Sequence, residues 1–310
     1  MSGLAELGFW EDVLATGLRL AVPLGLAAAG ELVSERAGVL NLGLEGTMAV
    51  GAFGGIAGAA AAGPGLGLVV GAACGALAGL LFAVLAVHLR INEIVVGFGL
   101  TIGGTGLASF LFRSRFPEAP DFTPYRGVRL PGLAEVPLLG PFLFAQPLVV
   151  WLLPVVAAAV ALFLRRTSAG LALRAVGDGP AAARARGVRV GLVRTAATVG
   201  GGALAGLGGA VLTAGLVGEF SDEVVGGRGW LALALVIVAG WRPALLVPTA
   251  LLVGSLQAFY LRAQSATEIG LPVSLLQALP FVVTLAVLSV RSSSVRAPAA
   301  LGRLTAEEEA

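Results

Sequence analysis

The stretch Glu35-Arg36-Ala37-Gly38-Val39-Leu40-Asn41-Leu42-Gly43-Leu44-Glu45-Gly46 sets charged groups, an amide and several glycines between two long apolar runs. Charged side chains in such surroundings are costly and are usually kept for function. We interpret the stretch as part of a path through a membrane. Its second half is the stronger candidate, because Glu35 and Arg36 are expected to form a structural ion pair at the membrane surface.

The composition assigns the chain to the membrane class. Of its 310 residues, 57% are hydrophobic and 12% are charged, and the mean hydropathy is +0.94. A soluble domain has about a quarter of its residues charged. The 46 glycines suit membrane helices whose backbones approach closely. We therefore predict an all-α, polytopic integral membrane protein.

Apolar runs able to cross roughly 30 Å of hydrocarbon predict about nine transmembrane helices. The second and seventh runs are short and are approached through glycine, and broken or short spans often carry the sites of transporters. The boundary at Trp241-Arg242-Pro243 leaves eight to ten helices as the range. No cleavable signal peptide is expected, because residues 1–9 carry no positive charge. The runs are 12–32, 46–62, 66–88, 93–112, 146–164, 195–217, 229–243, 244–262 and 272–290.

The arginines predict the orientation. With the N-terminus outside, 13 arginines fall in the inner connections and six in the outer ones, which favours N-out and C-in. Residues 1–292 then form the transmembrane domain. Within it, 113–145 is an irregular, proline-rich external loop and 165–194 is a cytoplasmic loop. Residues 293–310 form a polar cytoplasmic tail that is expected to be disordered.

Glycine pairs four residues apart recur in the second, third and sixth runs. A glycine-rich composition produces such spacings by chance, and close helix packing also produces them. Both interpretations are open on the sequence alone. The pairs are Gly51 and Gly55, Gly54 and Gly58, Gly71 and Gly75, Gly75 and Gly79, and Gly202 and Gly206.

The cytoplasmic loop contains one predicted short helix. Asp178 suits its N-cap, Pro180 its first turn and Gly187 its C-terminal stop. Such a helix either rests on anionic lipid or docks on a soluble partner and receives force from it. The residues proposed for docking are Asp178, Pro180, Ala181, Ala182, Arg184, Arg186 and Gly187.

Four blocks, spread between about residues 20 and 290, carry a resemblance to a known family. In them the chain resembles the permease subunit of a bacterial ABC importer, in the family shared by branched-chain amino acid, ribose-type sugar and nucleoside systems. The first and last blocks most resemble the nucleoside branch. The blocks are the opening stretch, Asn92-Glu93-Ile94-Val95-Val96-Gly97, Ser168-Ala169-Gly170-Leu171-Ala172-Leu173-Arg174-Ala175-Val176-Gly177 and Gly227-Arg228-Gly229-Trp230-Leu231-Ala232-Leu233-Ala234.

The resemblance implies a multi-pass subunit of the bacterial cytoplasmic (inner) membrane that forms half of a pore for nucleosides. Simple sugars and branched-chain amino acids are the alternative substrates. The implied partners are an ABC ATPase, a second permease that is a different, paralogous chain, an extracytoplasmic solute-binding lipoprotein and membrane lipid. No nucleic acid, cofactor or metal is implied.

The same resemblance implies that the subunit is not an enzyme. Residues 181–187 resemble the coupling helix that docks on the ATPase, although Ala181 stands where other ABC importers have glutamate. The chain has no phosphate-binding loop and no lysine to complete one. ATP hydrolysis is therefore expected in partner chains.

Six residues are candidates for the substrate path. A ribose with a base calls for amide and carboxylate partners and an aromatic face. Asn41 and Glu45 would share a face of a helix, and Asn92 would cap the fourth span. Capping and inter-helix hydrogen bonding are the alternative roles for the polar candidates, and ordinary packing for the aromatic ones. The six are Asn41, Glu45, Asn92, Phe53, Phe98 and Trp230.

A charged rim is predicted on the outer side. It would receive the binding protein through charge complementarity, or it is simply a solvated loop. The rival from another class is an ion-coupled secondary transporter, which needs an intramembrane carboxylate or histidine relay and no docking helix. The rim residues are Glu219, Asp222, Glu223 and Arg228.

Overall fold

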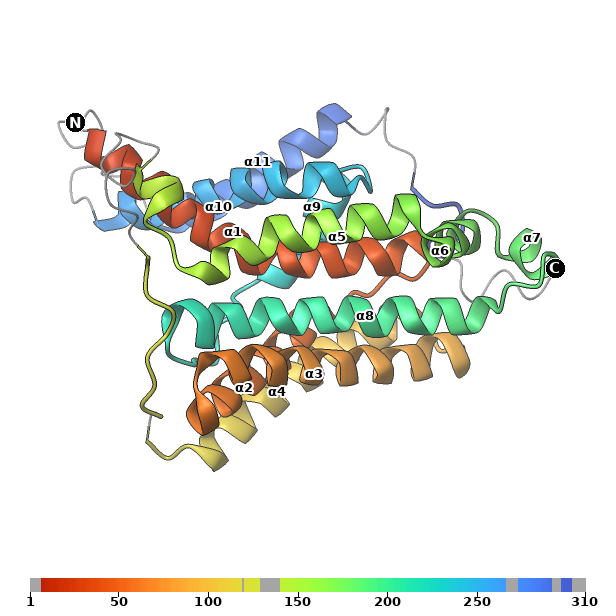
Figure 1. The fold of residues 1–310 in the computed structure, drawn as a ribbon, viewed down its shortest axis with the longest axis horizontal. Coiled ribbons are helices and arrows are strands. Elements are labelled where there is room, and N and C mark those ends of the chain that lie inside the picture. Colours follow the sequence, from red (N-terminus) through yellow and green to blue (C-terminus); the bar gives the residue numbers. More distant parts are fainter. Residues whose placement is uncertain (1–6, 119, 129–139, 266–272, 292–296, 303–310) are drawn as a thin grey trace.

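The computed structural model describes residues 7–118, 120–128, 140–265, 273–291 and 297–302 (Figure 1). Within these ranges, seven helical segments are long and apolar enough to cross a membrane. The prediction of an all-α, polytopic membrane protein is confirmed. The segments are α1 (Leu7–Arg36), α2 (Leu44–Ala62), α3 (Pro64–Ala83) with the π-helical turn η2 (Val84–His88), α4 (Glu93–Arg115), the 3₁₀ turn η4 (Leu148–Trp151) with α5 (Leu152–Arg166), α8 (Val190–Ala210) with the π-helical turn η5 (Val211–Val217), and α10 (Pro243–Ser265).

The two remaining predicted runs are also helices. They are α9 (Arg228–Val238) and α11 (Val273–Arg291). The 11 residues of α9 span roughly 16 Å, about half of the hydrocarbon thickness, so the seventh run is short as predicted. The second run is not short, because α2 begins at Leu44 and extends over 19 residues.

The break at Trp241-Arg242-Pro243 is real. The helix α9 ends at Val238 and α10 begins at Pro243. Between them the chain turns through Gly240 and Trp241, both with positive φ, and the Trp241 amide donates to the Val236 carbonyl oxygen at 3.1 Å. Proline is tolerated where α10 starts, because the first helical turn needs no amide donor.

The helix α1 lies at the centre of the bundle. It packs against α10, α8, α9 and α5, and Figure 1 shows it running beside α5 and α8, with α2, α3 and α4 on one side of this layer and α9, α10 and α11 on the other. Its side chains at Leu24, Leu26 and Leu32 have no exposed surface. All-round apolar character is what a helix enclosed by other helices requires.

Glycines bring α2, α3 and α8 into backbone contact. A Cβ atom built on Gly206 of α8 would lie 2.6 Å from the Gly75 Cα atom of α3, and one on Gly202 would lie 2.9 Å from the Gly79 Cα atom. Gly51 of α2 faces Gly206 in the same way. The glycine spacings therefore reflect close packing, the mode that small residues allow in membranes.

The segment between α4 and α5 is irregular where the structure describes it. After α4 ends at Arg115, residues 116–118 and 120–128 form neither helix nor strand, and a π-helical turn η3 (Gly140–Phe144) follows the residues left undescribed. Gly127 and Pro147 form an isolated antiparallel bridge. Of the predicted irregular segment 113–145, residues 113–115 still belong to α4 and 140–144 form η3.

The tail is ordered in part, contrary to the expectation for 293–310. The Ala300 amide donates to the Gly177 carbonyl oxygen at 2.9 Å, and Ala300 has no exposed surface. Leu301 packs against the main core. Small and apolar residues let 297–302 fit against the end of α6 (Ser168–Asp178), which composition alone does not reveal; residues 303–310 lie outside the described ranges.

Gly206→Leu is expected to destabilise the bundle. The side chain would meet the backbone of α3, which cannot move away as a flexible side chain can, and overpacking of this kind costs about 1–3 kcal/mol or more. The thermal midpoint of the purified protein should fall clearly. Gly200→Leu is the matched control on the same helix, because a Cβ atom there meets nothing within 4 Å. Equal midpoints for the two variants would contradict the packing assignment.

Candidate functional site

The opening stretch is a buried link between α1 and α2. Residues 37–43 are not helical. Two of their backbone amides donate hydrogen bonds to glutamates that come from two different helices. The Asn41 amide donates to Glu31 Oε1 at 2.8 Å, and the Leu40 amide donates to Glu93 Oε2 at 3.2 Å. Glu31 is 1% exposed and Glu93 5% exposed. The carboxylates thus provide the partners that buried backbone groups need.

Glu35 and Arg36 do not form the predicted surface ion pair. Glu35 is 1% exposed and accepts a hydrogen bond from the indole nitrogen of Trp241. The Arg36 guanidinium donates to the Trp241 carbonyl oxygen, at 3.1 Å from Nε and 2.6 Å from Nη2. Both side chains therefore hold Trp241 in the turn between α9 and α10, which lies some 200 residues further along the chain.

The expectation that Asn41 and Glu45 share a helix face is wrong. It precedes α2, and its Oδ1 atom accepts the Gly43 amide at 2.9 Å. This local side-chain to backbone bond is the usual asparagine turn, and it sets the chain direction into α2. Asn41 is 1% exposed, so its side chain is a structural element of the link.

Glu45 anchors the half-helix α9. Its two carboxylate oxygens accept the Gly227 amide at 2.8 Å and the Gly229 amide at 2.7 Å. These amides belong to the first turn of α9, where backbone donors have no partner within the helix. A negative charge there also favours the helix dipole. The inter-helix capping role, one of the two alternatives for this residue, is therefore the one that the geometry supports.

Asn92 caps α4 as predicted. Its Oδ1 atom accepts the amides of Ile94 at 2.9 Å and Val95 at 3.4 Å. Asn92 is exposed. Glu93, the next residue, turns inward to the link between α1 and α2, so the two neighbours serve different parts of the fold.

Two of the aromatic candidates meet on an open face. The ring centroids of Phe98 on α4 and Trp230 on α9 lie 5.6 Å apart, with the ring planes tilted by 40°. Phe98 is 47% exposed. Phe53 on α2 is partly buried and packs against the main core. The structure thus separates Phe53 from the aromatic pair, and places that pair next to the turn of α9 that Glu45 caps.

A polar row on α4 was not identified from the sequence. Thr101, Thr105, Ser109 and Arg113 are spaced four apart and so follow one side of the helix. The Thr101 hydroxyl donates to the Leu42 carbonyl oxygen at 3.2 Å, which ties α4 to the α1–α2 link. The sequence signal for this row is the constant spacing of four between polar residues within an apolar run.

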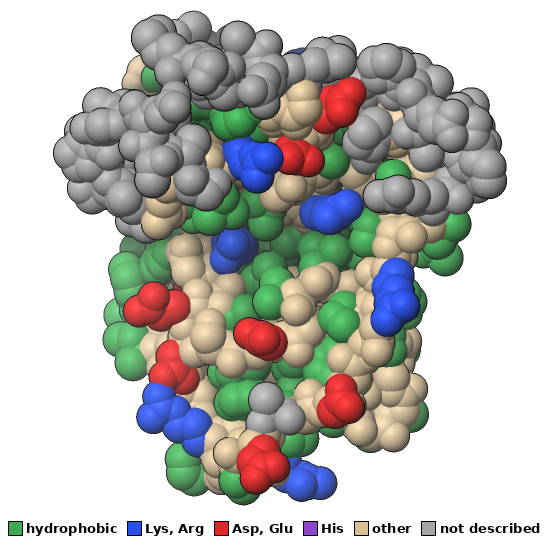
Figure 2. Space-filling view, turned by 90° about the vertical axis from the view of Figure 1, so that its left-hand side faces the viewer, with side chains coloured by type: hydrophobic (Ala, Val, Ile, Leu, Met, Phe, Trp, Pro, Cys, Tyr) green, Lys and Arg blue, Asp and Glu red, His purple; other side chains and the backbone are tan. Residues whose placement is uncertain are grey.

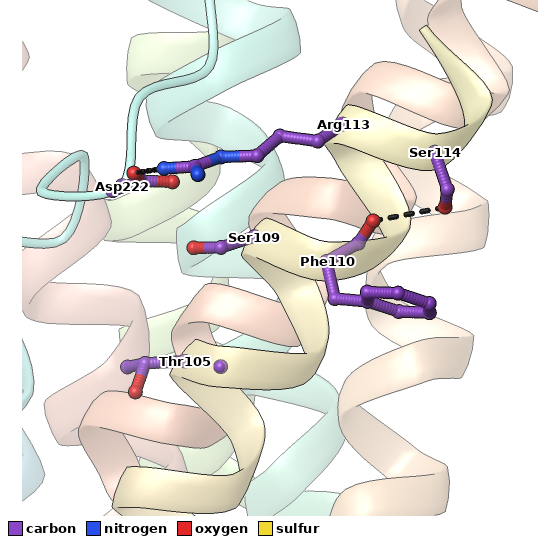
Figure 3. Close-up of a pocket in the computed structure, with 7 residues that line it drawn as sticks. Thr105, Ser109, Phe110, Arg113, Ser114 and Asp222 are labelled. Atoms are coloured by element: carbon purple, nitrogen blue, oxygen red, sulfur yellow. Dashed lines mark hydrogen bonds and ion pairs between the residues drawn. The ribbon is translucent and has the colours of Figure 1, made fainter.

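The C-terminal part of this row lines a pocket. Arg113 forms an ion pair with Asp222, which belongs to the loop between η5 and α9 (Figure 3). The pocket has a volume of about 730 Å³. Its lining residues are Thr105, Gly106, Ser109, Phe110, Arg113, Ser114 and Asp222.

Only part of the predicted charged rim is on the surface. Glu219, Asp222 and Glu223 are exposed. Arg228 is half-buried and donates from Nη1 to the carbonyl oxygens of Val224 at 2.9 Å and Val225 at 3.1 Å. The arginine turns inward because it closes the loop that leads into α9. Figure 2 shows acidic and basic side chains interspersed on this end of the molecule.

At the other end of the bundle, the loop 165–194 forms two helices where one was predicted. They are α6 and α7 (Pro180–Ala185). The Thr167 hydroxyl oxygen accepts the Gly170 amide at 3.0 Å, so α6 starts early and runs through Asp178. Asp178 is therefore not the N-cap of α7; Gly179 is, without a side-chain capping bond.

The other signals for α7 were correct. Pro180 lies in its first turn, and Gly187 ends it with φ +83°, a conformation that glycine adopts without strain. Only Pro180 and Ala183 are buried, the latter against Val176 and Val190. The exposed residues of the predicted docking set are Asp178, Ala181, Ala182, Arg184, Arg186 and Gly187.

These features define a polytopic membrane protein of the transport class, with a half-helix capped inside the bundle and an open face along α4. Residues 13–288 match the family described as the permease component of the branched-chain amino acid transport system. The chain belongs to this family, which confirms the resemblance inferred from the four sequence blocks. It is accordingly a multi-pass protein of the cytoplasmic membrane.

Several curated relatives are similar over nearly the whole chain. A putative glucose ABC transporter permease of Haloferax volcanii is 36% identical over 94% of this chain and 95% of its own. A nucleoside ABC transporter permease of Lactococcus lactis is 33% identical over the same shares. A guanosine ABC transporter permease of Bacillus subtilis is 31% identical over 84% of this chain and 83% of its own. No solved structure matches.

Glu45→Ala is expected to lower the free energy of unfolding by about 2–4 kcal/mol, because two amides at the start of α9 lose their acceptor at a buried position. Glu45→Gln keeps one acceptor oxygen and should lie between this variant and the wild type. Thermal unfolding of the purified protein measures the order, with exposed Glu118→Ala as control. An unchanged midpoint for Glu45→Ala would show that α9 does not depend on this carboxylate.

Trp241→Phe is expected to destabilise the protein by about 1–3 kcal/mol, because the buried Glu35 carboxylate loses its donor while most of the aromatic volume is retained. Trp151→Phe is the matched control, since Trp151 is 43% exposed. The thermal midpoints of both variants should be compared in the same detergent. A loss of equal size in the control would attribute the effect to aromatic volume alone.

Proposed function

We propose that this chain is the transmembrane permease subunit of an ATP-driven importer and forms half of its translocation pore. Family membership supports the transport role, and the exposed helix α7 supports an external energy source. A short helix that buries only Pro180 and Ala183 presents the rest of its surface to a partner. The proposed partners are an ABC ATPase, a second related permease and an extracytoplasmic binding lipoprotein.

The proposed orientation is N-out and C-in. It rests on the arginine distribution and is consistent with the position of α7, which lies at the opposite end of the bundle from the start of α1 (Figure 1). The ATPase would then dock on α7 and the binding protein on the exposed carboxylates Glu219, Asp222 and Glu223. Arg228 is withdrawn from the docking set, because its guanidinium is engaged within its own loop.

Nucleosides are the proposed substrates, with simple sugars as the alternative. Relatives named for nucleoside, guanosine and glucose transport support this class, and all of these compounds carry ring hydroxyls. Branched-chain amino acids, which the family description names, are the third choice. The substrate path would follow the open face at Phe98 and Trp230. Asn41, Glu45, Asn92 and Phe53 would support it from positions within the fold.

The function is tested by reconstituting the chain with the ABC ATPase, second permease and binding lipoprotein of the proposed system. ATP-dependent uptake of labelled guanosine is expected, with glucose uptake as the outcome that favours the alternative. Uptake driven by an ion gradient without the ATPase would favour a secondary transporter and contradict the proposal.

Reversing charge at Arg184 and Arg186 to glutamate should reduce uptake by roughly tenfold or more, because charge complementarity guides docking of partners. Membrane insertion and thermal stability should be unchanged, since both side chains are exposed. Reversal at Arg165 and Arg166, exposed at the end of α5, is the matched control. Normal uptake by the Arg184 and Arg186 variant would mean that α7 only rests on the membrane surface. An equal loss of uptake in the Arg165 and Arg166 variant would indicate a general dependence on anionic lipid.

A further inference from the structure

The pocket at the outer end of α4 contains an ion pair with unused hydrogen-bonding capacity. The Arg113 and Asp222 side chains are 72% and 49% exposed. A carboxylate offers about four acceptor sites and a guanidinium five donors, so one mutual contact leaves most of them available. Figure 3 shows the two groups pointing toward one another across the pocket, from α4 and from the loop before α9.

Two hydroxyls extend this polar wall. Ser109 and Thr105 follow Arg113 along α4, and Figure 3 shows both side chains on the same side of the helix as Asp222. The Thr105 hydroxyl donates to the Thr101 carbonyl oxygen at 2.8 Å, which leaves its oxygen free to accept. The nearby Ser109 hydroxyl and the ion pair with Arg113 lower the pKa of Asp222, so the carboxylate is ionised at neutral pH.

The opposite wall is apolar, and the helix surface between the walls is open. Phe110 is 67% exposed and points away from Asp222 (Figure 3). Gly106 lies one turn before it, and a Cβ atom built there meets nothing within 4 Å. A flat ligand can therefore approach the α4 backbone between an aromatic side chain and a row of polar groups. Sites for small molecules combine these features.

This arrangement fits the edge of a sugar ring. Adjacent ring hydroxyls can donate hydrogen bonds to the Asp222 carboxylate and to the hydroxyl oxygens of Thr105 and Ser109, and can accept them from the Arg113 guanidinium. Hydrogen bonds to the two charged groups are stronger than those between neutral groups. The charges of Arg113 and Asp222 cancel, which favours a neutral ligand. A zwitterionic amino acid would instead compete with the existing ion pair for the charges of both side chains.

We propose that the pocket formed by Thr105, Gly106, Ser109, Phe110, Arg113 and Asp222 binds the vicinal hydroxyls of a sugar ring. The assignment rests on the proposed function, since it supplies the substrate class that the path would receive. It moves Asp222 from docking of the binding protein to contact with the substrate.

Saturation-transfer-difference NMR on the purified full chain in lipid nanodiscs tests the proposal, because it detects weak binding without the partner chains. The probes are guanosine, its 2′,3′-dideoxy analogue, glucose and leucine. Signals at the sugar protons of guanosine and glucose are expected, with much weaker signals from the dideoxy analogue. Asp222→Asn should weaken guanosine binding by roughly tenfold, the size of one lost charge-assisted hydrogen bond.

Asp12→Asn is the matched control. It breaks the comparably exposed ion pair that Asp12 forms with Arg262 at 2.8 Å, far from α4 in sequence, and should leave guanosine binding unchanged. The exchange Arg113→Asp with Asp222→Arg restores an ion pair between helix and loop but should not restore binding. Thermal midpoints verify that each variant is folded.

The proposal is overturned if the wild type gives no sugar signal, or if the wild type and Asp222→Asn bind guanosine equally. It is also overturned if the exchanged pair recovers binding, because the ion pair would then only hold the loop in place. A leucine signal in place of a sugar signal would likewise overturn it. Guanosine uptake by the reconstituted transporter is measured separately, so the proposed function can stand where this site fails.

Discussion

The fold depends on a carboxylate placed at the end of a half-helix. The helix α9 is too short to cross a bilayer, so its first turn lies inside the bundle, where unpaired amides are costly. Glu45 accepts the amides of Gly227 and Gly229. Gly229 has no room for a side chain against the Glu45 backbone, and this absence lets the carboxylate reach both donors. The position of α9, and with it the Phe98–Trp230 pair, follows from this contact between residues 184 positions apart.

The far end of α9 is fixed by the same stretch of sequence. Glu35 and Arg36 hold the indole and the carbonyl oxygen of Trp241, so residues 35–46 contact both ends of the half-helix. The link also receives Glu93 from the start of α4. The charged stretch is therefore a junction of α1, α2, α4 and α9. This gives a physical reason for its polar residues that requires no contact with substrate.

Sequence patterns predicted the parts of this structure that depend on neighbouring residues. Hydropathy located the nine apolar helices found among the described residues. Asn92, Pro180 and Gly187 were assigned correctly from local signals, whereas the glycine spacings left chance and close packing open until the structure showed the contacts. The errors concern partners distant in the chain. Nothing near Glu45 or Glu35 indicates Gly227 or Trp241, and the helical spacing of Asn41 and Glu45 failed because a non-helical link lies between α1 and α2. The polar row on α4 could have been found from the sequence, because its spacing of four residues is a local pattern. The pocket could not, because it also needs Asp222 from a loop distant in the sequence.

The junction also meets the segment that carries α7. A Cβ atom at Gly177, near the end of α6, would collide with the Arg36 carbonyl group, and the same glycine accepts the Ala300 amide. Because the backbones of Gly177 and Arg36 are in contact, no side chain lies between them that could change rotamer when α6 moves. A shift of α6 must therefore move residues 36–38 or separate from them, and Arg36 is bonded to the turn that ends α9. Close packing transmits strain in this way, so these contacts connect the segment of α6 and α7 to the turn that positions α9.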